Sequence, residues 1–146
     1  METALLNLYA SNFVAYYKAH QAHINVVGRN FVSDHKMLGK VYEDLQAEID
    51  VIGELIRTCE MPVPSTLNEI TMISDIKDDA YLDDGDGIGY LEGVYDDLEQ
   101  MIQLHLVLEE ETEDIREYNH IANYAQDRVK TLKKYCWQLR SILSER

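Results

Sequence analysis

HQAHINVVGRNFVSDHKMLGKVYEDLQAEIDVIGE, residues 20–54, is the stretch that decides the fold of this chain. Its hydrophobic pattern predicts two helical segments separated by a short break at residues 28–30. Four side chains in these segments carry the nitrogen and oxygen donors that an iron-type metal accepts. These candidate metal ligands are His23, His35, Asp50 and Glu54.

The spacing of the candidate ligands excludes one shared site within a single chain. A helix rises about 1.5 Å per residue, so His35 and Asp50 on one helix would lie roughly 22 Å apart. A single metal ion cannot bridge that distance. If the four residues form one site, two subunits must build it.

The composition predicts one domain over residues 1–146 that does not attract nucleic acid. With 146 residues and 46% hydrophobic content, the chain is long enough to bury a core. Seven Gly and two Pro predict long regular elements. The net charge of −14, from 27 acidic and 13 basic residues, argues against nucleic-acid binding and favours cations as ligands.

The cysteines and the hydropathy are typical of a cytoplasmic protein. Cys59 and Cys136 share no metal-ligand spacing, which indicates reduced thiols. The chain begins without a basic segment followed by an apolar run, and it contains no apolar stretch of about 18 residues. We therefore expect neither secretion nor insertion into a membrane.

The first helix is predicted over residues 3–27. One stripe with helical steps places its histidines on the inward face, and this stripe consists of Leu5, Tyr9, Phe13, Tyr16, His20, His23 and Val27. A histidine in such a stripe is often a core residue with satisfied hydrogen bonds, so His23 is either a core residue or a metal ligand. Gly28 is expected to cap the end of this helix.

The second helix is predicted over residues 31–59, and two of the candidate ligands lie off its apolar seam. At about 100° per residue, Asp50 and Glu54 sit about 120° and 160° from the centre of the seam, one turn apart. Carboxylates in that position usually belong to a solvated face. The nearby Ala47 and Gly53 keep this flank small and apolar, however, which suits contact with a second subunit.

Two further helices are predicted over residues 88–117 and 119–143, after a long crossover. The crossover, residues 60–87, carries a short helix that opens at a capping box from Thr66 to Glu69. Its DDGDG segment does not match the register of a calcium-binding loop and is interpreted as a solvated turn. The acidic side chains of the third helix either form a solvated surface or, in a closed cavity, collect cations.

Four long helices with a crossover after the second predict an all-α, ferritin-like four-helix bundle. The usual metal site of such bundles needs a Glu on each of two helices and a Glu-x-x-His on each of the others. Only residues 117–120 have that form, and they fall where the third helix meets the fourth. The sequence therefore predicts that the intra-bundle di-iron site is absent.

These residues resemble the Dps family, the mini-ferritins that protect DNA during starvation and oxidative stress. The resemblance spans residues 19–143 and is carried by AHQAHINVVGRNFVSDHKMLGKVYEDLQAEIDVIGELI, PVPSTLNEITMISDIKD and DRVKTLKKYCWQLRSIL. Its most specific part is the spacing of His23, His35, Asp50 and Glu54, which is similar to the family's ferroxidase pattern.

The resemblance implies a homo-oligomer, a dodecameric shell with di-iron ferroxidase sites at its two-fold interfaces. His23 and His35 would come from one subunit, and Asp50 and Glu54 from its neighbour. His20 would be a core residue or lie beside the site. The implied activity is oxidation of Fe(II) by hydrogen peroxide, or by dioxygen, and storage of ferric mineral inside the shell, which protects against oxidative damage.

Two departures from the family pattern bear on this function. Ile24 stands where the family commonly has a Trp, which puts the role of an indole beside the site in doubt, and Tyr16, Tyr17 and Tyr42 are candidates to replace it as an oxidisable neighbour. No Lys-rich extension is present, and at −14 per chain we expect no direct DNA binding at physiological salt. The alternatives are a Dps-like shell or interaction protein without efficient iron oxidation, which Ile24 favours, and a monomeric helical bundle.

Overall fold

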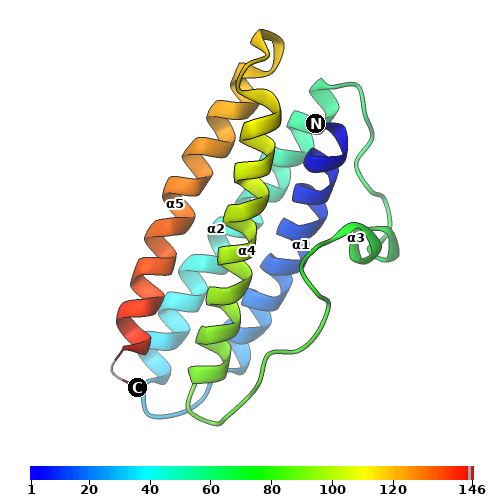
Figure 1. Ribbon diagram of the computed structural model, residues 1–146. Helices are drawn as coiled ribbons and strands as arrows, with labels where there is room; N and C mark the ends of the chain where they lie inside the picture. The colour runs from blue at the N-terminus through cyan, green and yellow to red at the C-terminus, as the bar shows by residue number, and fades with distance from the viewer. Residues whose placement is uncertain (145) are drawn as a thin grey trace.

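Four long helices form one bundle in the computed structural model of this protein, which describes residues 1–144 and 146 (Figure 1). The helices are α1 (Glu2–Asn25), α2 (Phe31–Thr58), α4 (Ile88–Thr112) and α5 (Asn119–Leu143). Helix α1 packs against α2 and α4, and α4 packs against α5. The predicted all-α, ferritin-like bundle is therefore confirmed.

A long crossover between α2 and α4 carries the short helix α3 (Leu67–Ile73). The hydroxyl of Thr66 accepts a hydrogen bond from the N–H of Glu69 at 3.1 Å, and the Glu69 carboxylate accepts one from the N–H of Ser65 at 3.2 Å. The first bond caps the helix as predicted, whereas the Glu69 carboxylate reaches one residue beyond the N-cap, to Ser65, and not to the N–H of Thr66 as in a regular capping box. Figure 1 shows the crossover passing outside α1 with α3 at its side, from one end of the bundle to the other.

The buried Lys18 of α1 ties the crossover to the bundle. Its Nζ donates to the carbonyl oxygen of Lys77 at 3.0 Å and to Oδ1 of Asp79 at 3.1 Å. On the other side it forms an ion pair with Asp97 of α4 at 3.1 Å. The ammonium also lies 4.6 Å from the ring centroid of Tyr81. One side chain thus joins α1, α4 and the last part of the crossover.

The bundle core is aliphatic, and α2 contributes a seam at helical spacing that includes the fully buried Leu38, Leu45, Ile52 and Ile56. The stripe predicted for α1 was partly wrong. Besides Leu5, the most buried apolar positions of α1 are Leu8, Ala10, Ala15, Ala19 and Ala22. Because small side chains let α1 approach its neighbours closely, the larger rings lie at the edge of the helix. His20 and His23 are accordingly half-buried beside α2 and are not core residues.

Two predicted helix ends were also wrong. Helix α1 ends at Asn25, where Val26 is the cap residue with φ −58° and ψ 138°, so Gly28 is not the cap. Gly28 has φ +117°, and a Cβ atom there would lie 3.0 Å from the Cα of Asp86. Because Gly28 has no side chain, the loop between α1 and α2 can pass close to the loop that precedes α4. The third long helix stops at Thr112, and a 3₁₀ turn, η1 (Arg116–Tyr118), leads into α5.

Across the described part of the chain, no helix combines the length and the apolar character that crossing a bilayer requires.

Candidate metal centre

His23 and His35 lie against each other where α1 ends and α2 begins. Their rings are stacked, with centroids 3.8 Å apart and an interplanar angle of 17°. Nδ1 of each ring lies 2.7 Å from the backbone carbonyl oxygen of the other histidine. The carbonyl of His23 belongs to the last turn of α1, where helix geometry leaves carbonyls unpaired. The ring of His35 therefore also caps α1.

These reciprocal hydrogen bonds decide the tautomer of both rings. A carbonyl oxygen can only accept, so Nδ1 of each ring donates its proton, and in the neutral ring Nε2 keeps its lone pair. Metal-binding histidines are oriented in the same way when a backbone carbonyl holds their other nitrogen. The pair therefore presents two nitrogen donors at one place.

A glycine of α2 makes room for the His23 ring. A Cβ atom at Gly39 would lie 3.0 Å from Cε1 and 3.1 Å from Nδ1 of His23. A side chain at this position would require the His23 ring to shift from the place where it stacks on His35. Gly39 was not among the predicted site residues, although a glycine inside a helix, which costs about 0.5–1 kcal/mol relative to alanine, can signal such a close approach.

A buried ion pair fixes the first turn of α2, one residue before His35. Asp34 is fully buried, and its carboxylate accepts hydrogen bonds from Nη1 and Nη2 of Arg146 at 2.8 and 2.7 Å. Gly87 lies against the Asp34 carboxylate, and a side chain at this position would clash with it, because a Cβ atom there would lie 2.5 Å from Oδ2 of Asp34. No spacing in the sequence indicates this contact, since its partners are 112 residues apart.

Aromatic rings continue from the histidine pair along the contact between α1 and α2. The ring of Tyr42 lies 5.0 Å from that of His23 and stacks on His20 at 4.0 Å. The hydroxyl of Tyr16 hydrogen-bonds with Nδ1 of His20 at 3.3 Å. Tyr42 is therefore beside the pair and Tyr16 one ring further away. Tyr17 is 53% exposed and lines a groove beside α3 instead.

Asp50 and Glu54 lie one turn apart on the exposed flank of α2. Both line an open groove of about 470 Å³, together with Tyr9, Gln46, Ile49, Gly53, Arg57 and Val63. The pKa of Glu54 is raised, because its protonated carboxyl group can donate a hydrogen bond to Asp50 and because the charge of the Asp50 carboxylate disfavours its ionisation. A cation would relieve the repulsion between two neighbouring carboxylates, so this pair is a candidate second set of metal donors.

One chain therefore brings the candidate ligands together as two separate pairs. The histidines stand at the start of α2 and the carboxylates in its second half, and α2 runs without interruption from Phe31 to Thr58. Among the residues that the structure describes, no three His, Cys, Asp or Glu side chains lie close enough to hold a metal ion. Each pair by itself offers two protein donors.

Comparison with known proteins places the chain in a family. A model of the ferritin-like domain matches residues 2–146. The chain is 25% identical to DNA protection during starvation protein 2 of Bacillus anthracis, over 90% of this chain and 88% of that protein. Family members generally store iron and oxidise Fe(II).

Solved structures agree with this assignment. The Dps protein of Vibrio cholerae O1, described as a member of a broad superfamily of ferritin-like diiron-carboxylate proteins, superposes with a TM-score of 0.89. It is 24% identical, over 97% of this chain and 87% of that one. CAIP of Helicobacter cinaedi is 26% identical with a TM-score of 0.86, over 98% and 99% of the two chains. The chain therefore belongs to the ferritin-like family and, within it, to the Dps family that its sequence resembles.

Proposed function

We propose that this protein oxidises Fe(II) at sites that two subunits build together, and that it stores the ferric product. His23 and His35 of one subunit would bind iron with Asp50 and Glu54 of the next. The observation that carries the proposal is the reciprocal hydrogen bonding of the two histidines. It leaves both Nε2 atoms available as lone-pair donors at the same place.

The donor set suits iron before and after oxidation. Imidazole nitrogen binds Fe(II) well, and the two carboxylates supply negative charge that favours the more highly charged Fe(III). Four protein ligands also leave positions for water or an oxidant. Binding of iron would relieve the repulsion between Asp50 and Glu54 that raises the pKa of Glu54.

Hydrogen peroxide is the proposed oxidant, with dioxygen as the alternative. Each of two Fe(II) ions gives up one electron, and the O–O bond of the peroxide accepts both electrons and breaks. Two protons then complete two water molecules. Removing Fe(II) and peroxide in one step keeps them from producing hydroxyl radicals. Position 24 is isoleucine and not the tryptophan common in the family. Tyr42 is an oxidisable side chain that lies beside the histidine pair.

The surface around both pairs supports assembly with further copies of the chain. Ile24, Val27 and Phe31 surround the loop beside the histidines and are 57%, 50% and 41% exposed. Val51, next to Asp50, is 42% exposed. Apolar side chains gathered around polar donors are typical of a contact between proteins. We extend this to the dodecameric shell that the Dps resemblance implies.

The test is Fe(II) oxidation with peroxide, followed by the absorbance of the ferric product. We expect a double variant, His35→Ala with Asp50→Ala, to lose most of the rate, because each proposed site would lose one ligand from each subunit. A matched control, His120→Ala with Asp96→Ala, removes exposed groups of the same types elsewhere. Equal rates for the native chain and the first variant would exclude the assigned site.

A ferroxidase-silent shell is the second candidate function, and Ile24 is the observation that favours it. Such a protein would assemble in gel filtration as a large species yet oxidise Fe(II) no faster than buffer. A small species would instead indicate a monomeric bundle and contradict both shell functions. Size and rate, measured on the same sample, therefore separate the three.

A further inference from the structure

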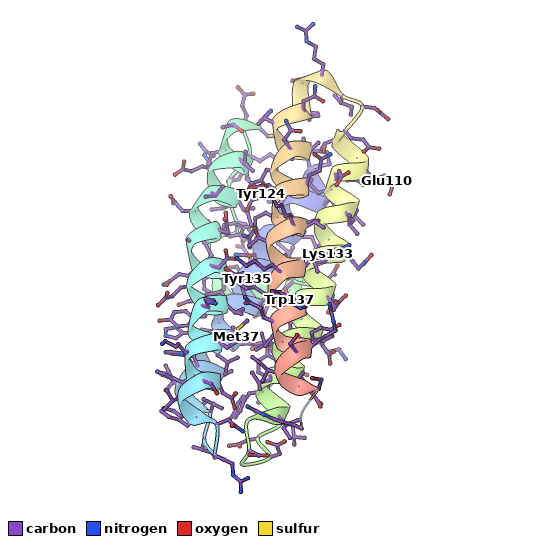
Figure 2. All side chains as sticks on the ribbon, turned by 90° about the vertical axis from the view of Figure 1, so that its left-hand side faces the viewer. Met37, Glu110, Tyr124, Lys133, Tyr135 and Trp137 are labelled. Carbon is purple, nitrogen blue, oxygen red and sulfur yellow. The ribbon has the colours of Figure 1, made fainter. Side chains whose placement is uncertain are left out.

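The outer face of α5 carries positive charge around an exposed tryptophan. Lys130, Lys134 and Trp137 follow one another at positions i, i+4 and i+7, on one side of the helix, and Lys133 adjoins them. All four side chains are exposed, that of Trp137 to 56%. The sequence has no Asp or Glu between residues 128 and 143. These four residues are the basic face of α5, and Figure 2 shows Lys133 and Trp137 along this helix.

Negative charge gathers at the turn between α4 and α5. Residues 109–117 read EEETEDIRE, in which Arg116 is the only cation. Three of the carboxylates, those of Glu113, Asp114 and Glu117, are exposed. Ile115 lies among them in the sequence and is 43% exposed. The acidic end of the chain is defined by these three carboxylates together with Ile115.

The two charged surfaces cannot neutralise each other within one chain. Gln126 of α5 donates to Oε1 of Glu109 of α4 at 3.4 Å, which shows the level at which the two helices lie side by side. From this contact, Lys133 lies seven residues toward one end of the bundle and Glu113 four residues toward the other. They are therefore separated by roughly 16 Å along the bundle, beyond the Debye length of about 8 Å at physiological salt.

Neither surface finds partners elsewhere in the chain. Among the residues that the structure describes, no ion pair involves a lysine of the basic face or a carboxylate of the acidic end. The positive charge of one surface and the negative charge of the other are thus both available to another molecule. A second copy of the chain carries the opposite charge for each of them.

The two surfaces also match in their apolar parts. Each has one exposed apolar side chain, Trp137 or Ile115, within a group of charges of one sign. An apolar centre with a polar rim is typical of contacts between proteins, and tryptophan is enriched among the residues that contribute most to binding. Charge and shape of this kind fit a contact between the basic face of one copy and the acidic end of another.

We propose that the basic face of α5 docks onto the acidic end of a second copy of the chain, with Trp137 against Ile115 at the centre. Because the contact joins two different surfaces, each copy keeps one surface for a further copy, and a closed ring can form. The proposed contact between the histidine and carboxylate pairs is two-fold and ends at two chains. The shell that would store the ferric product needs a second kind of contact, so this inference deepens the proposed function and rests on it.

The experiment reverses the charges of each surface separately and then together. Lys133→Glu with Lys134→Glu makes the basic face acidic, and Glu113→Lys with Asp114→Lys makes the acidic end basic. Each pair of substitutions sets like charges against each other, so sedimentation velocity at about 0.15 M salt should show the loss of every species larger than a pair of chains. All four substitutions together restore opposite charges and the formal charge of −14, and the large native species should return.

Trp137 is the only tryptophan of the chain, so its fluorescence reports directly on the basic face. Docking removes the indole from water, and we expect the native emission at a shorter wavelength than that of either charge-reversed variant. The variant with all four substitutions should regain the native emission. A matched control, Lys40→Glu with Lys77→Glu, changes the formal charge as much as Lys133→Glu with Lys134→Glu, at exposed positions outside both surfaces. It should keep the native size and emission.

Fe(II) oxidation on the same samples separates this contact from the proposed function. Variants that form only pairs of chains should keep the native initial rate per chain, but their ferric product should precipitate because no shell encloses it. A native chain with the expected size that oxidises no Fe(II) would contradict the ferroxidase function alone. The docking contact would be overturned by a native chain no larger than a pair, by charge-reversed variants of native size, or by a four-substitution variant that stays small.

Discussion

Gly39 of α2 lies so close to the ring of His23 that a Cβ atom at position 39 would be 3.0 Å from Cε1. We expect Gly39→Ala to displace the ring and break the hydrogen bond between Nδ1 of His23 and the carbonyl of His35. Loss of such an orienting bond lowers metal affinity by about 10–100-fold. A Co²⁺ titration measures the effect. Lys40→Ala, an exposed neighbour, is the control, and equal affinities of the two variants would contradict the assigned role of His23.

Mixed assemblies test whether the two pairs of ligands belong to different subunits. One chain carries His23→Ala with His35→Ala, and the other carries Asp50→Ala with Glu54→Ala. Neither should oxidise Fe(II) alone. After unfolding and reassembly together, about a quarter of the two-fold sites should combine intact histidines with intact carboxylates. Return of about a quarter of the native rate is expected, whereas no return would show that the four residues do not act across subunits.

His105 of α4, which is fully buried and has no hydrogen-bond partner in the described part of the chain, should make the protein sensitive to mild acid. Its pKa in the folded chain is about 3, below the ordinary value of 6.5, so only the unfolded chain takes up a proton between these limits. Stability is therefore complete above pH 6.5 and falls as the pH decreases toward 3, by at most about 1.4 kcal/mol per pH unit. The thermal midpoint of His105→Leu should fall less between pH 7 and pH 5 than that of the native chain.

The control for this experiment is His120→Gln, which removes an exposed histidine from the start of α5. It should keep the pH dependence of the native chain. If His105→Leu lost stability in acid as steeply as His120→Gln, the unpaired state of His105 would not be the cause.

Lys18 should be essential for holding the crossover. Lys18→Met removes the cationic partner of the largely buried Asp97 carboxylate and the donor to the carbonyl of Lys77. We expect a loss of about 2–3 kcal/mol in the free energy of unfolding, because the hydrogen bond from Tyr81 alone does not balance the charge of Asp97. Urea denaturation measures the loss, and cleavage by protease should begin in the crossover. Lys36→Met, at an exposed position of α2, should change neither.

DNA binding should be absent at physiological salt. The formal charge of −14 over these 146 residues repels phosphate. A mobility-shift assay with duplex DNA at about 0.15 M salt checks this. A retarded band whose intensity falls with added salt would show that a local basic surface overcomes the net charge.

The periodic part of the fold was predictable from the sequence. The seam of α2, with Leu38, Leu45 and Ile52, has helical spacing, and the core buries these residues. Thr66 and Glu69 indicated the start of α3, because the hydrogen bonds that cap a helix join residues close together in the sequence. The end of α1 was misjudged because glycine is common just after a helix, whereas Gly28 serves a contact with the loop before α4.

Contacts between distant parts of the chain were not predictable in this way. The candidate ligands could be named from their types and spacing, but the carbonyl partners of His23 and His35 depend on how α1 meets α2. Arg128 is one of several basic residues in α5, and no spacing in the sequence distinguishes it from the others. Only the packing of α5 against α2 shows that it lies between Asp44 and Glu48.

The unbroken α2 has a consequence for an assembled pair of subunits. Each subunit would contribute its histidines to one site and its carboxylates to the other. Because both pairs lie on the same helix, the length of α2 between them fixes the separation of the two sites at roughly 22 Å. One residue inserted between His35 and Asp50 would turn the carboxylates by about 100° relative to the histidines and misalign both sites together. The length of this helix is therefore as much a part of the proposed catalytic chemistry as the four ligands that it helps to place.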